Sequence, residues 1–307
     1  MALDLLSRMY VRANREKYAI GQFNVSNLEF TQAAVQAAAE CNAPIILAAS
    51  SSAIKYAGIE QLVAIVKSLA NSVSAPIALH LDHGADINQA RECIEHGFTS
   101  VMIDASHAPL EENIRITKEV VALARRSGVT VEAELGRLGG IEDEVEVDAK
   151  DAHLTDVNEA ERFVRETRCD ALAVAVGTSH GAYKFKGKPV IAFDRIAEIK
   201  KRVGIPLVLH GASSVEPAAV EMINKYGGKI DDAHGLDDES YKRAISAGVC
   251  KVNIDTDLRL VWAATLRKLL AENPGEFDPR KLLGPAREAV RDEIKHKIKL
   301  LGSVAKA

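Results

Sequence analysis

The segment Ile77-Ala-Leu-His-Leu-Asp-His-Gly84 starts as an apolar β-strand and ends in a carboxylate, an imidazole and a glycine. Two later apolar strands end in the same kind of dipeptide, His180-Gly181 and His210-Gly211. Enzymes built on parallel sheets keep their chemistry at the carboxyl ends of the strands. A catalytic zinc ion takes three protein ligands and keeps a fourth position for substrate. One carboxylate and three imidazoles at strand ends therefore indicate a catalytic metal site.

This strand is one of eight short apolar runs that alternate with helical patterns along the chain. The runs are almost continuously hydrophobic, as expected for parallel strands that are buried on both faces. They cover Ala19–Val25, Pro44–Ala49, Ile77–Leu81, Ser100–Ile103, Val129–Leu135, Ala171–Val176, Pro206–Leu209 and Gly248–Ile254. Eight β/α units predict an α/β fold, a (β/α)8 TIM barrel in which residues 1–307 form a single domain.

The helical patterns between the runs carry recognisable end signals. Asn27 is expected to cap a helix over Asn27–Glu40, and Gly128 is expected to end a helix over Leu110–Ser127. An open doubly wound sheet is the alternative to the barrel. It needs a glycine-rich phosphate turn after the first strand, and Gly21-Gln-Phe-Asn-Val25 is not such a turn.

From about residue 257 to residue 307 the chain reads as a helical C-terminal extension. Breaks are expected at Asn273-Pro-Gly275 and at Gly284-Pro285. An apolar stripe at helical spacing runs along it at Val290, Ile294, Ile298 and Leu301. This stripe packs either on the outside of the barrel or on another subunit.

Two loops have distinctive compositions. Gly136–Asp156, after the fifth run, is long, glycine-rich and acidic, and is either a solvated excursion or a mobile lid. Gly181–Lys188, after the sixth run, is bounded by glycines and basic.

Composition excludes several classes of protein. With 47% hydrophobic and 27% charged residues the chain is expected to be globular rather than disordered. It has no apolar run long enough for a membrane span and no secretory signal pattern at the amino terminus. Four widely spaced cysteines indicate reduced thiols in a cytoplasmic protein. A net charge of −4 without a long basic run argues against nucleic acid, so an anionic substrate would need locally placed positive charge.

Five segments, in order along nearly the whole chain, resemble the signature motifs of the class II, metal-dependent fructose-bisphosphate aldolases. They are Ala75–Gly84, Val131–Glu142, Ala175–Gly181, Val208–Ser213 and Lys251–Asp257. The resemblance implies a lyase that reversibly cleaves fructose 1,6-bisphosphate to dihydroxyacetone phosphate and glyceraldehyde 3-phosphate through a zinc-stabilised enediolate. This chemistry suits the residues, because a metal acting as a Lewis acid stabilises the charge that develops on a ketone oxygen.

The resemblance also implies roles for particular residues. His83, His180 and His210 would bind Zn²⁺ or another divalent ion such as Co²⁺. Asp82 would exchange the proton of the C4 hydroxyl, and Glu142 would be the base that acts on dihydroxyacetone phosphate. Asp82 could instead orient His83, and Glu142 could be a solvated loop acid. Asp104 and Glu134 resemble ligands of a second or alternative metal position, and could equally be outer partners of the zinc histidines.

Two phosphates and the sugar hydroxyls need further contacts. The ketose-side phosphate site is expected at Gly181, Lys184, Gly211, Ser213, Asn253 and Thr256. The sugar hydroxyls or the far phosphate are expected at Asn24, Ser50, Asp255 and Arg259. The family also implies that Arg280 reaches the site of a neighbouring subunit, so that the protein is a homo-oligomer, a dimer or a tetramer. A monovalent cation near the phosphate site is compatible with the resemblance.

There are four alternatives to this interpretation. Tagatose-1,6-bisphosphate aldolase shares the metal site and differs only in the C4 stereocentre of its substrate. A Schiff-base aldolase would use Lys251 as nucleophile but would leave the three histidines without a role. A zinc-dependent barrel hydrolase often has an HxH pair on the first strand, and this chain has none there. A non-catalytic scaffold is expected to lack some of the catalytic residues, all of which are present.

Overall fold

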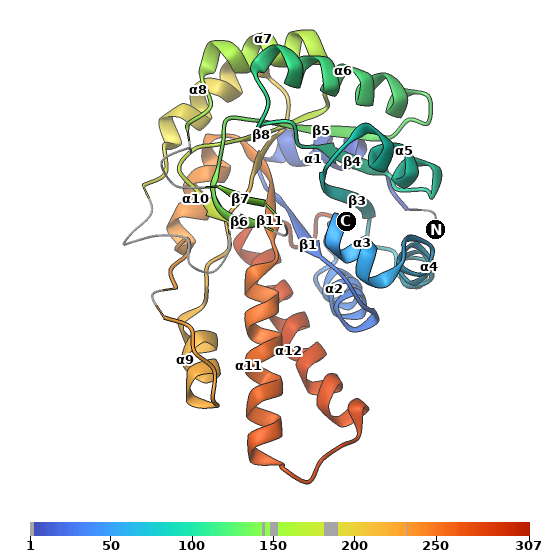
Figure 1. Cartoon of the computed structure of the whole chain (residues 1–307), viewed down its shortest axis with the longest axis vertical. Coiled ribbons are helices and arrows are strands. Elements are labelled where there is room, and N and C mark those ends of the chain that lie inside the picture. Colours follow the sequence, from blue (N-terminus) through green and yellow to red (C-terminus); the bar gives the residue numbers. More distant parts are fainter. Residues whose placement is uncertain (1–2, 143–144, 148–152, 181–189, 232) are drawn as a thin grey trace.

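The computed structural model describes residues 3–142, 145–147, 153–180, 190–231 and 233–307, without the side chains of 139–142, 145–147 and His180. Eight parallel strands form a closed barrel in the order β1-β11-β10-β8-β5-β4-β3-β2 (Figure 1). Their bounds are β1 Ile20–Asn24, β2 Ile45–Ser50, β3 Ile77–Gly84, β4 Ser100–Ile103, β5 Thr130–Leu135, β8 Ala171–Val174, β10 Leu207–Leu209 and β11 Val249–Ile254. All eight predicted strands are confirmed, and the closed barrel excludes the open doubly wound sheet.

Helices cover the outside of the barrel and close its amino end. Their bounds are α1 Leu6–Glu16, α2 Leu28–Cys41, α3 Ser51–Ala57, α4 Ile59–Ala70, α5 Ile87–Glu95, α6 Leu110–Arg125, α7 Val157–Thr167, α8 Phe193–Val203, α9 Pro217–Lys225, α10 Asp238–Ala247, α11 Thr256–Glu272 and α12 Pro279–Leu300. The predicted cap is confirmed, because Asn27 Oδ1 accepts from the Phe30 amide at 2.9 Å. α6 ends two residues earlier than predicted, and Gly128 follows with φ +68°.

The amino end of the barrel is filled by apolar side chains. Leu6, Met9 and Tyr10 on α1 form one buried cluster with inward-facing residues near the starts of the strands, such as Ile20 and Ile46. Alternation along a strand places every second side chain on the inner face. The helix therefore closes the amino end, and polar groups are left for the opposite, carboxyl end.

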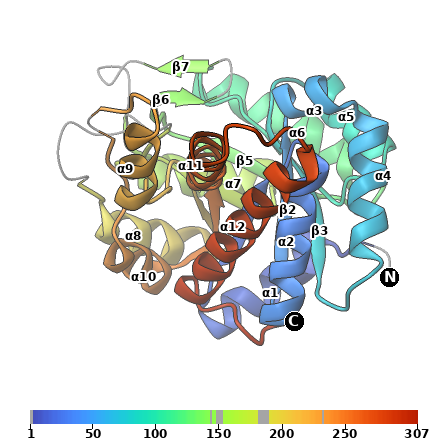
Figure 2. The same cartoon turned by 90° about the horizontal axis from the view of Figure 1, so that it is seen from below.

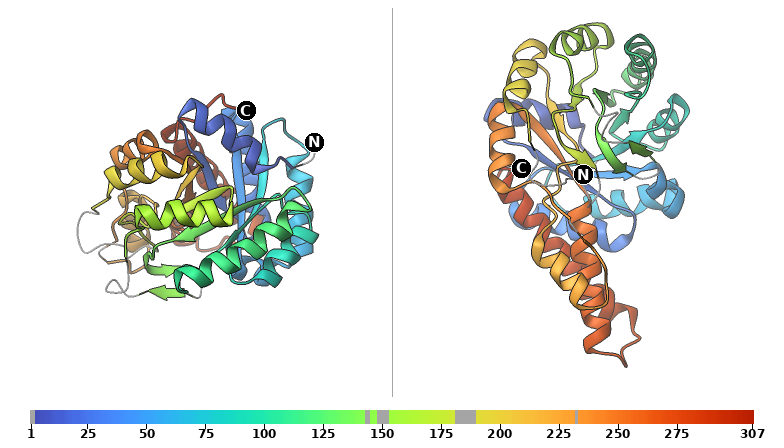
Figure 3. Two further views of the ribbon diagram at one scale, coloured as in Figure 1. Left: turned by 90° about the horizontal axis from the view of Figure 1, so that it is seen from above. Right: turned by 60° about the vertical axis from the view of Figure 1, so that its left-hand side comes forward.

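The C-terminal extension is a helical hairpin of α11 and α12 that projects beyond the barrel (Figures 1 and 3). α12 lies beside α2 on the barrel wall (Figure 2). The apolar stripe on α12 is 0–1% exposed and belongs to the main core, so it packs on its own barrel rather than on a partner. The predicted break at residues 273–275 is confirmed. The break expected at Gly284-Pro285 is wrong, because Pro285 lies inside α12, whose packing outweighs the lost backbone hydrogen bond.

A small second sheet combines two strands from the segment expected to be a loop with a third strand that ends at His180. β6 (Gly139–Glu142) pairs antiparallel with β7 (Val145–Val147) and parallel with β9 (Ser179–His180). These strands were not predicted because they are only two to four residues long, and β6 is half glycine. None of the described helices combines the length and the apolar character that a membrane crossing requires.

Candidate metal centre and active site

Polar side chains gather where the barrel strands end. Ser50 at the end of β2 is the register partner of Asp82 on β3, and Gln22 on β1 is the partner of Asn253 on β11. Asp82, Ser50 and Asn253 are each no more than 7% exposed. The closed sheet thus brings residues far apart in sequence to one buried layer, as the strand-end pattern predicted.

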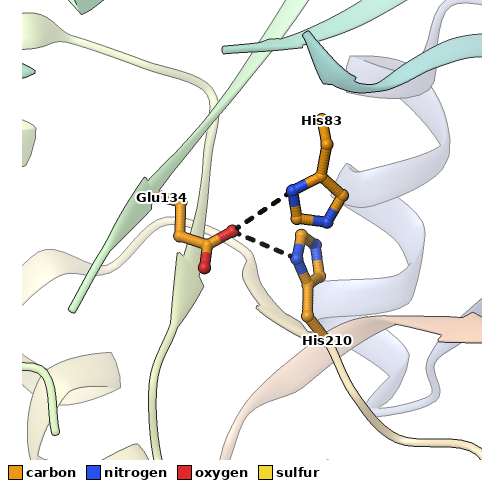
Figure 4. A group of neighbouring side chains, drawn as sticks. All are labelled: His83, Glu134 and His210. Atoms are coloured by element: carbon orange, nitrogen blue, oxygen red, sulfur yellow. Dashed lines mark ion pairs between the residues drawn. The ribbon is translucent and has the colours of Figure 1, made fainter. Parts of the chain in front are cut away.

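Three of these strands contribute a group of metal-ligand side chains, His83, Glu134 and His210 (Figure 4). Each offers one donor atom, and the three atoms lie within 4.8 Å of one another. Glu134 Oε2 is 3.2 Å from His210 Nδ1 and 3.8 Å from His83 Nδ1, and the two rings meet edge to face at 4.7 Å. Two imidazoles and one carboxylate are a ligand set of catalytic zinc sites, so the residues present fit a divalent ion.

The backbone at the end of β3 turns His83 toward this group. The register with β4 shifts between Leu81 and Gly84, and His83 has φ +46°, which is uncommon for a residue with a side chain. A Cβ on Gly84 would lie 2.4 Å from the Met102 carbonyl oxygen of β4. The His-Gly pair therefore has a physical basis, because the strained turn aims the imidazole and only glycine fits against the next strand.

Asp104, at the end of β4, contacts the same imidazole. Its Oδ2 lies 2.9 Å from His83 Nδ1, and its Oδ1 accepts from the Ser106 amide at 3.1 Å. Burial acts to raise the pKa of the Asp104 carboxyl, but His83 and Ser106 outweigh it and hold that pKa well below its ordinary value. Asp104 therefore contacts His83 in the way that outer carboxylates contact metal-bound histidines.

Glu132 is a site residue that the sequence analysis missed. Its Oε1 lies 3.1 Å from His210 Nε2, and both its oxygens accept from Lys251 Nζ at 2.7 Å. Burial acts to raise the pKa of Glu132, but Lys251 and His210 hold it well below its ordinary value. The available signal was the spacing of Glu132 and Glu134, which places both on one face of β5.

The contacts of Glu132 also bear on the predicted metal ligand His210 and on Lys251, the nucleophile of the Schiff-base alternative. Burial acts to lower the pKa of His210, but Glu132 and Glu134 raise it to about 9. A metal ion would compete with a proton for this imidazole, because metal binding requires the neutral form of histidine. Lys251 is 0% exposed and both oxygens of Glu132 hold its ammonium, so it is not placed as a Schiff-base nucleophile.

Asp82 is held by two amides in the upper part of the barrel. Asn24 donates to its Oδ2 at 2.7 Å and Asn253 donates to its Oδ1 at 3.1 Å. These bonds orient the carboxylate beside His83 on the same strand. A pocket opens next to it, lined by residues that include Asn24, Ser50, Asp255 and Arg259. All four of those residues were predicted as substrate contacts, and the structure brings them together.

The turn after β10 carries two further predicted residues, Gly211 and Ser213. Gly211 has φ +59°, and a Cβ there would lie 2.6–2.9 Å from backbone atoms of Ser179. Ser213 is 4% exposed. Thr256 begins α11 directly after β11, so its backbone lies at the positive end of a helix dipole. These positions suit an anion at the barrel mouth.

Some of the remaining predicted residues belong to other elements, and some lie outside the described part of the chain. His180 was predicted to end an apolar barrel strand, but β8 stops at Val174, and the backbone of His180 lies instead on β9, where it pairs with Gly140 of β6. The backbone of Glu142 lies on β6 and pairs with Val145 of β7. Gly181 and Lys184 lie outside the described residues. Arg280 is in the first turn of α12 on the projecting hairpin, 89% exposed and paired with Asp278 at 2.8 Å.

Comparison with known proteins agrees with this geometry. A sequence model of the family described as class-II fructose-bisphosphate aldolase matches residues 4–306. A fructose-bisphosphate aldolase of Thermus caldophilus is 53% identical over 296 residues, covering 96% of this chain and 97% of that protein. One from Giardia intestinalis is 47% identical and covers 100% and 95%. The YdjI aldolase of Escherichia coli K12 superposes with a TM-score of 0.80 at 32% identity over 100% of both chains. The chain therefore belongs to the class II fructose-bisphosphate aldolase family.

Proposed function

We propose that this enzyme reversibly cleaves fructose 1,6-bisphosphate to dihydroxyacetone phosphate and glyceraldehyde 3-phosphate. The observation that carries the proposal is the convergence of His83, Glu134 and His210 beside Asp82, in a chain of the class II family. The curated relatives are named fructose-bisphosphate aldolases, which favours the fructose substrate over the tagatose isomer.

The metal proposed for this site is Zn²⁺ or a similar divalent ion. His83 and His210 would hold it with His180, and Glu134 offers a carboxylate ligand or an alternative position between the two imidazoles. Asp104 and Glu132 would hold the rings of His83 and His210 in place. When bound, the ion would act as a Lewis acid on the ketone oxygen.

Proton transfers are assigned to two carboxylates. In cleavage, Asp82 takes the proton of the C4 hydroxyl, which lets the C3–C4 bond break and the aldehyde leave. Its orientation by Asn24 and Asn253 supports this role, because a general base must be positioned before its pKa matters. Glu142 returns a proton to the carbon that becomes the hydroxymethyl group of dihydroxyacetone phosphate. In condensation both transfers run in reverse.

The substrate's phosphates are assigned to separate parts of the barrel mouth. Gly211 and Ser213, with Gly181, Lys184, Asn253 and Thr256, would bind the ketose-side phosphate, and a monovalent cation could share that site. Asn24, Ser50, Asp255 and Arg259 line one pocket and would contact hydroxyls or the far phosphate.

The far phosphate would also be bound by Arg280 of a second subunit. Residues 257–307 would then make contacts in a dimer or tetramer of single-domain barrels. The support is the projection of the α11–α12 hairpin, which places an exposed arginine away from its own barrel. The four cysteines all lie in the described part of the chain and are free, which supports a reducing compartment such as the cytoplasm.

The test of this function is aldehyde release from fructose and tagatose bisphosphates, with and without a chelator. We expect release from the fructose substrate, loss of activity on chelation and recovery with zinc or cobalt. Full activity after exhaustive chelation, with borohydride trapping of a substrate on Lys251, would refute it.

A further inference from the structure

The turn Gly211–Val215, which joins β10 to α9, has a backbone that needs external support. Val215 is 2% exposed and has φ +53°. A β-branched residue in this region is a true outlier, and such strain persists only when the surroundings over-determine it. The turn carries Gly211 and Ser213, so whatever holds it also sets the geometry of the proposed phosphate site.

The first support is a buried carboxylate from the start of α11. Asp257 accepts from the Ser214 amide at 2.9 Å and from the Val215 amide at 2.7 Å. Asp257 is 0% exposed. One carboxylate thus fixes two successive peptide groups directly after Ser213.

The second support comes from α12, near the end of the chain. Lys297 Nζ lies 3.0 Å from Asp257 Oδ2, donates to Ser214 Oγ at 2.5 Å and is 3.2 Å from Glu293 Oε1. The Lys297 side chain is 0% exposed. The ammonium therefore contacts both the turn and the carboxylate that holds the turn.

Tyr241 on α10 completes the cluster. Its hydroxyl donates to the Ala212 carbonyl and lies 3.2 Å from Ser214 Oγ. The ring is buried, and Lys297 Nζ lies 5.6 Å from its centroid. Groups from α10, α11 and α12 therefore contact Ala212, Ser214 and Val215, on both sides of Ser213.

A buried lysine ammonium on this face of α12 is not expected to give the fold its greatest stability. Val290, Ile294 and Ile298 on the same helix are fully buried and apolar. A well-packed apolar residue often stabilises a fold as well as a buried ion pair does, or better. The distinctive feature of Lys297 is its contact with the turn, which an apolar side chain could not make.

We propose that Lys297, acting through Asp257, is a positioning residue that holds the Gly211–Val215 turn in the shape that binds the phosphate of dihydroxyacetone phosphate. The inference rests on the proposed function, since that function places a phosphate at Gly211 and Ser213. Lys297 lies on the C-terminal helix and touches the turn, so it acts on the anion through the backbone.

The test compares Lys297→Met with Lys295→Met in the full-length, zinc-loaded enzyme. Lys295 is on the same helix and pairs with Glu40 at 2.5 Å, so it is a matched ion-pair control. Calorimetry with dihydroxyacetone phosphate should show about tenfold weaker binding in Lys297→Met, equal to roughly 1.4 kcal/mol. Lys295→Met should bind as the parent does. KM for the bisphosphate should rise with kcat retained, because uniform binding is lost.

Two measurements separate positioning from general support of the fold. Zinc titration should give unchanged affinity in Lys297→Met, and a parallel loss of zinc affinity would overturn the proposal. Tyr241→Phe keeps the buried ring and removes only the hydroxyl, so it decides the question if Lys297→Met fails to fold. We expect it to weaken binding of dihydroxyacetone phosphate about threefold, because the net contribution of a neutral hydroxyl's hydrogen bonds is modest.

Ser213→Ala distinguishes failure of this inference from failure of the proposed function. Normal binding in Lys297→Met and Tyr241→Phe, with weakened binding in Ser213→Ala, would overturn the positioning role alone. Normal binding in all three variants would show that the phosphate does not bind at this turn. It would overturn both the positioning role and the proposed function. Equal weakening in Lys297→Met and Lys295→Met would also contradict the positioning role.

Discussion

Glu132 and Glu134 stand two residues apart on β5 and have opposite surroundings. Both are buried, at 0% and 3% exposed. Glu132 is neutralised by the Lys251 ammonium at 2.7 Å, whereas Glu134 faces the imidazoles of His83 and His210. In the lower layer of the barrel, the cation that pairs with Glu132 is therefore a side chain of the protein itself, Lys251. In the upper layer, Glu134 instead contacts two imidazoles that, together with it, could hold a metal ion.

Strand β5 contributes to both stability and chemistry. A buried carboxylate is costly unless it is paired and hydrogen-bonded. Lys251 meets that need for Glu132, which in turn contacts His210 on its Nε2 side. The Lys251–Glu132 ion pair thus also contacts His210, a candidate metal ligand, in the manner of outer partners of metal-bound histidines.

The largest loss of activity is expected from Asp82→Ala and Glu142→Ala. Each should lower the rate of cleavage by about 10²–10⁴-fold, which is typical of a lost general acid–base group. Glu142→Ala should also lose hydrogen exchange on dihydroxyacetone phosphate, while Asp82→Ala should retain much of it. Both variants should still bind zinc. Equal loss of cleavage and exchange in both would contradict these assignments.

The different roles of the two glutamates can be tested directly with the variants Glu134→Gln and Glu132→Gln. Glu134→Gln should lower zinc affinity by more than the roughly 10–100-fold expected for an outer partner, and leave the melting temperature of the metal-free protein nearly unchanged. Glu132→Gln should lower the free energy of unfolding by about 3–5 kcal/mol, because Lys251 is left as an unpaired buried charge.

Metal titration and thermal unfolding of the two metal-free variants would measure this difference. If Glu134→Gln proved the more destabilising and Glu132→Gln the weaker zinc binder, the roles of the two layers would be reversed.

A smaller loss of substrate binding is expected from Arg280→Ala on the α11–α12 hairpin. It should raise KM for the bisphosphate by about tenfold, the value of a lost hydrogen bond between charged groups. Proton exchange on dihydroxyacetone phosphate should change little, because the lost contact concerns the other phosphate. Mixing Arg280→Ala with Asp82→Ala subunits should regenerate some active sites if the subunits exchange. A fully active monomer by light scattering would exclude the donated arginine.

The barrel could be predicted because each buried strand leaves a local signal. Continuous apolar runs mark the eight strands, and polar residues mark their ends. Asp82, His83 and His210 were found in this way. The structure also brings Asn24, Ser50, Asp255 and Arg259 around one pocket, as the family resemblance implied.

The missed features depend on contacts between distant segments. Lys251 and Glu132 are separated by 119 residues, so nothing local shows that they pair. Lys297 sits among the apolar residues of α12, where sequence spacing shows only a core-facing helix. Helix propensity alone predicts a break at Pro285, because propensity does not include the packing that keeps α12 continuous.

Anomalous diffraction at the zinc absorption edge, from crystals of the zinc-loaded enzyme, would locate the metal. We expect a strong peak at the carboxyl end of the barrel, ligated by the imidazoles of His83 and His210. A peak elsewhere on the chain, or no bound zinc in crystals of an enzyme that still cleaves the bisphosphate, would contradict this assignment of the metal site.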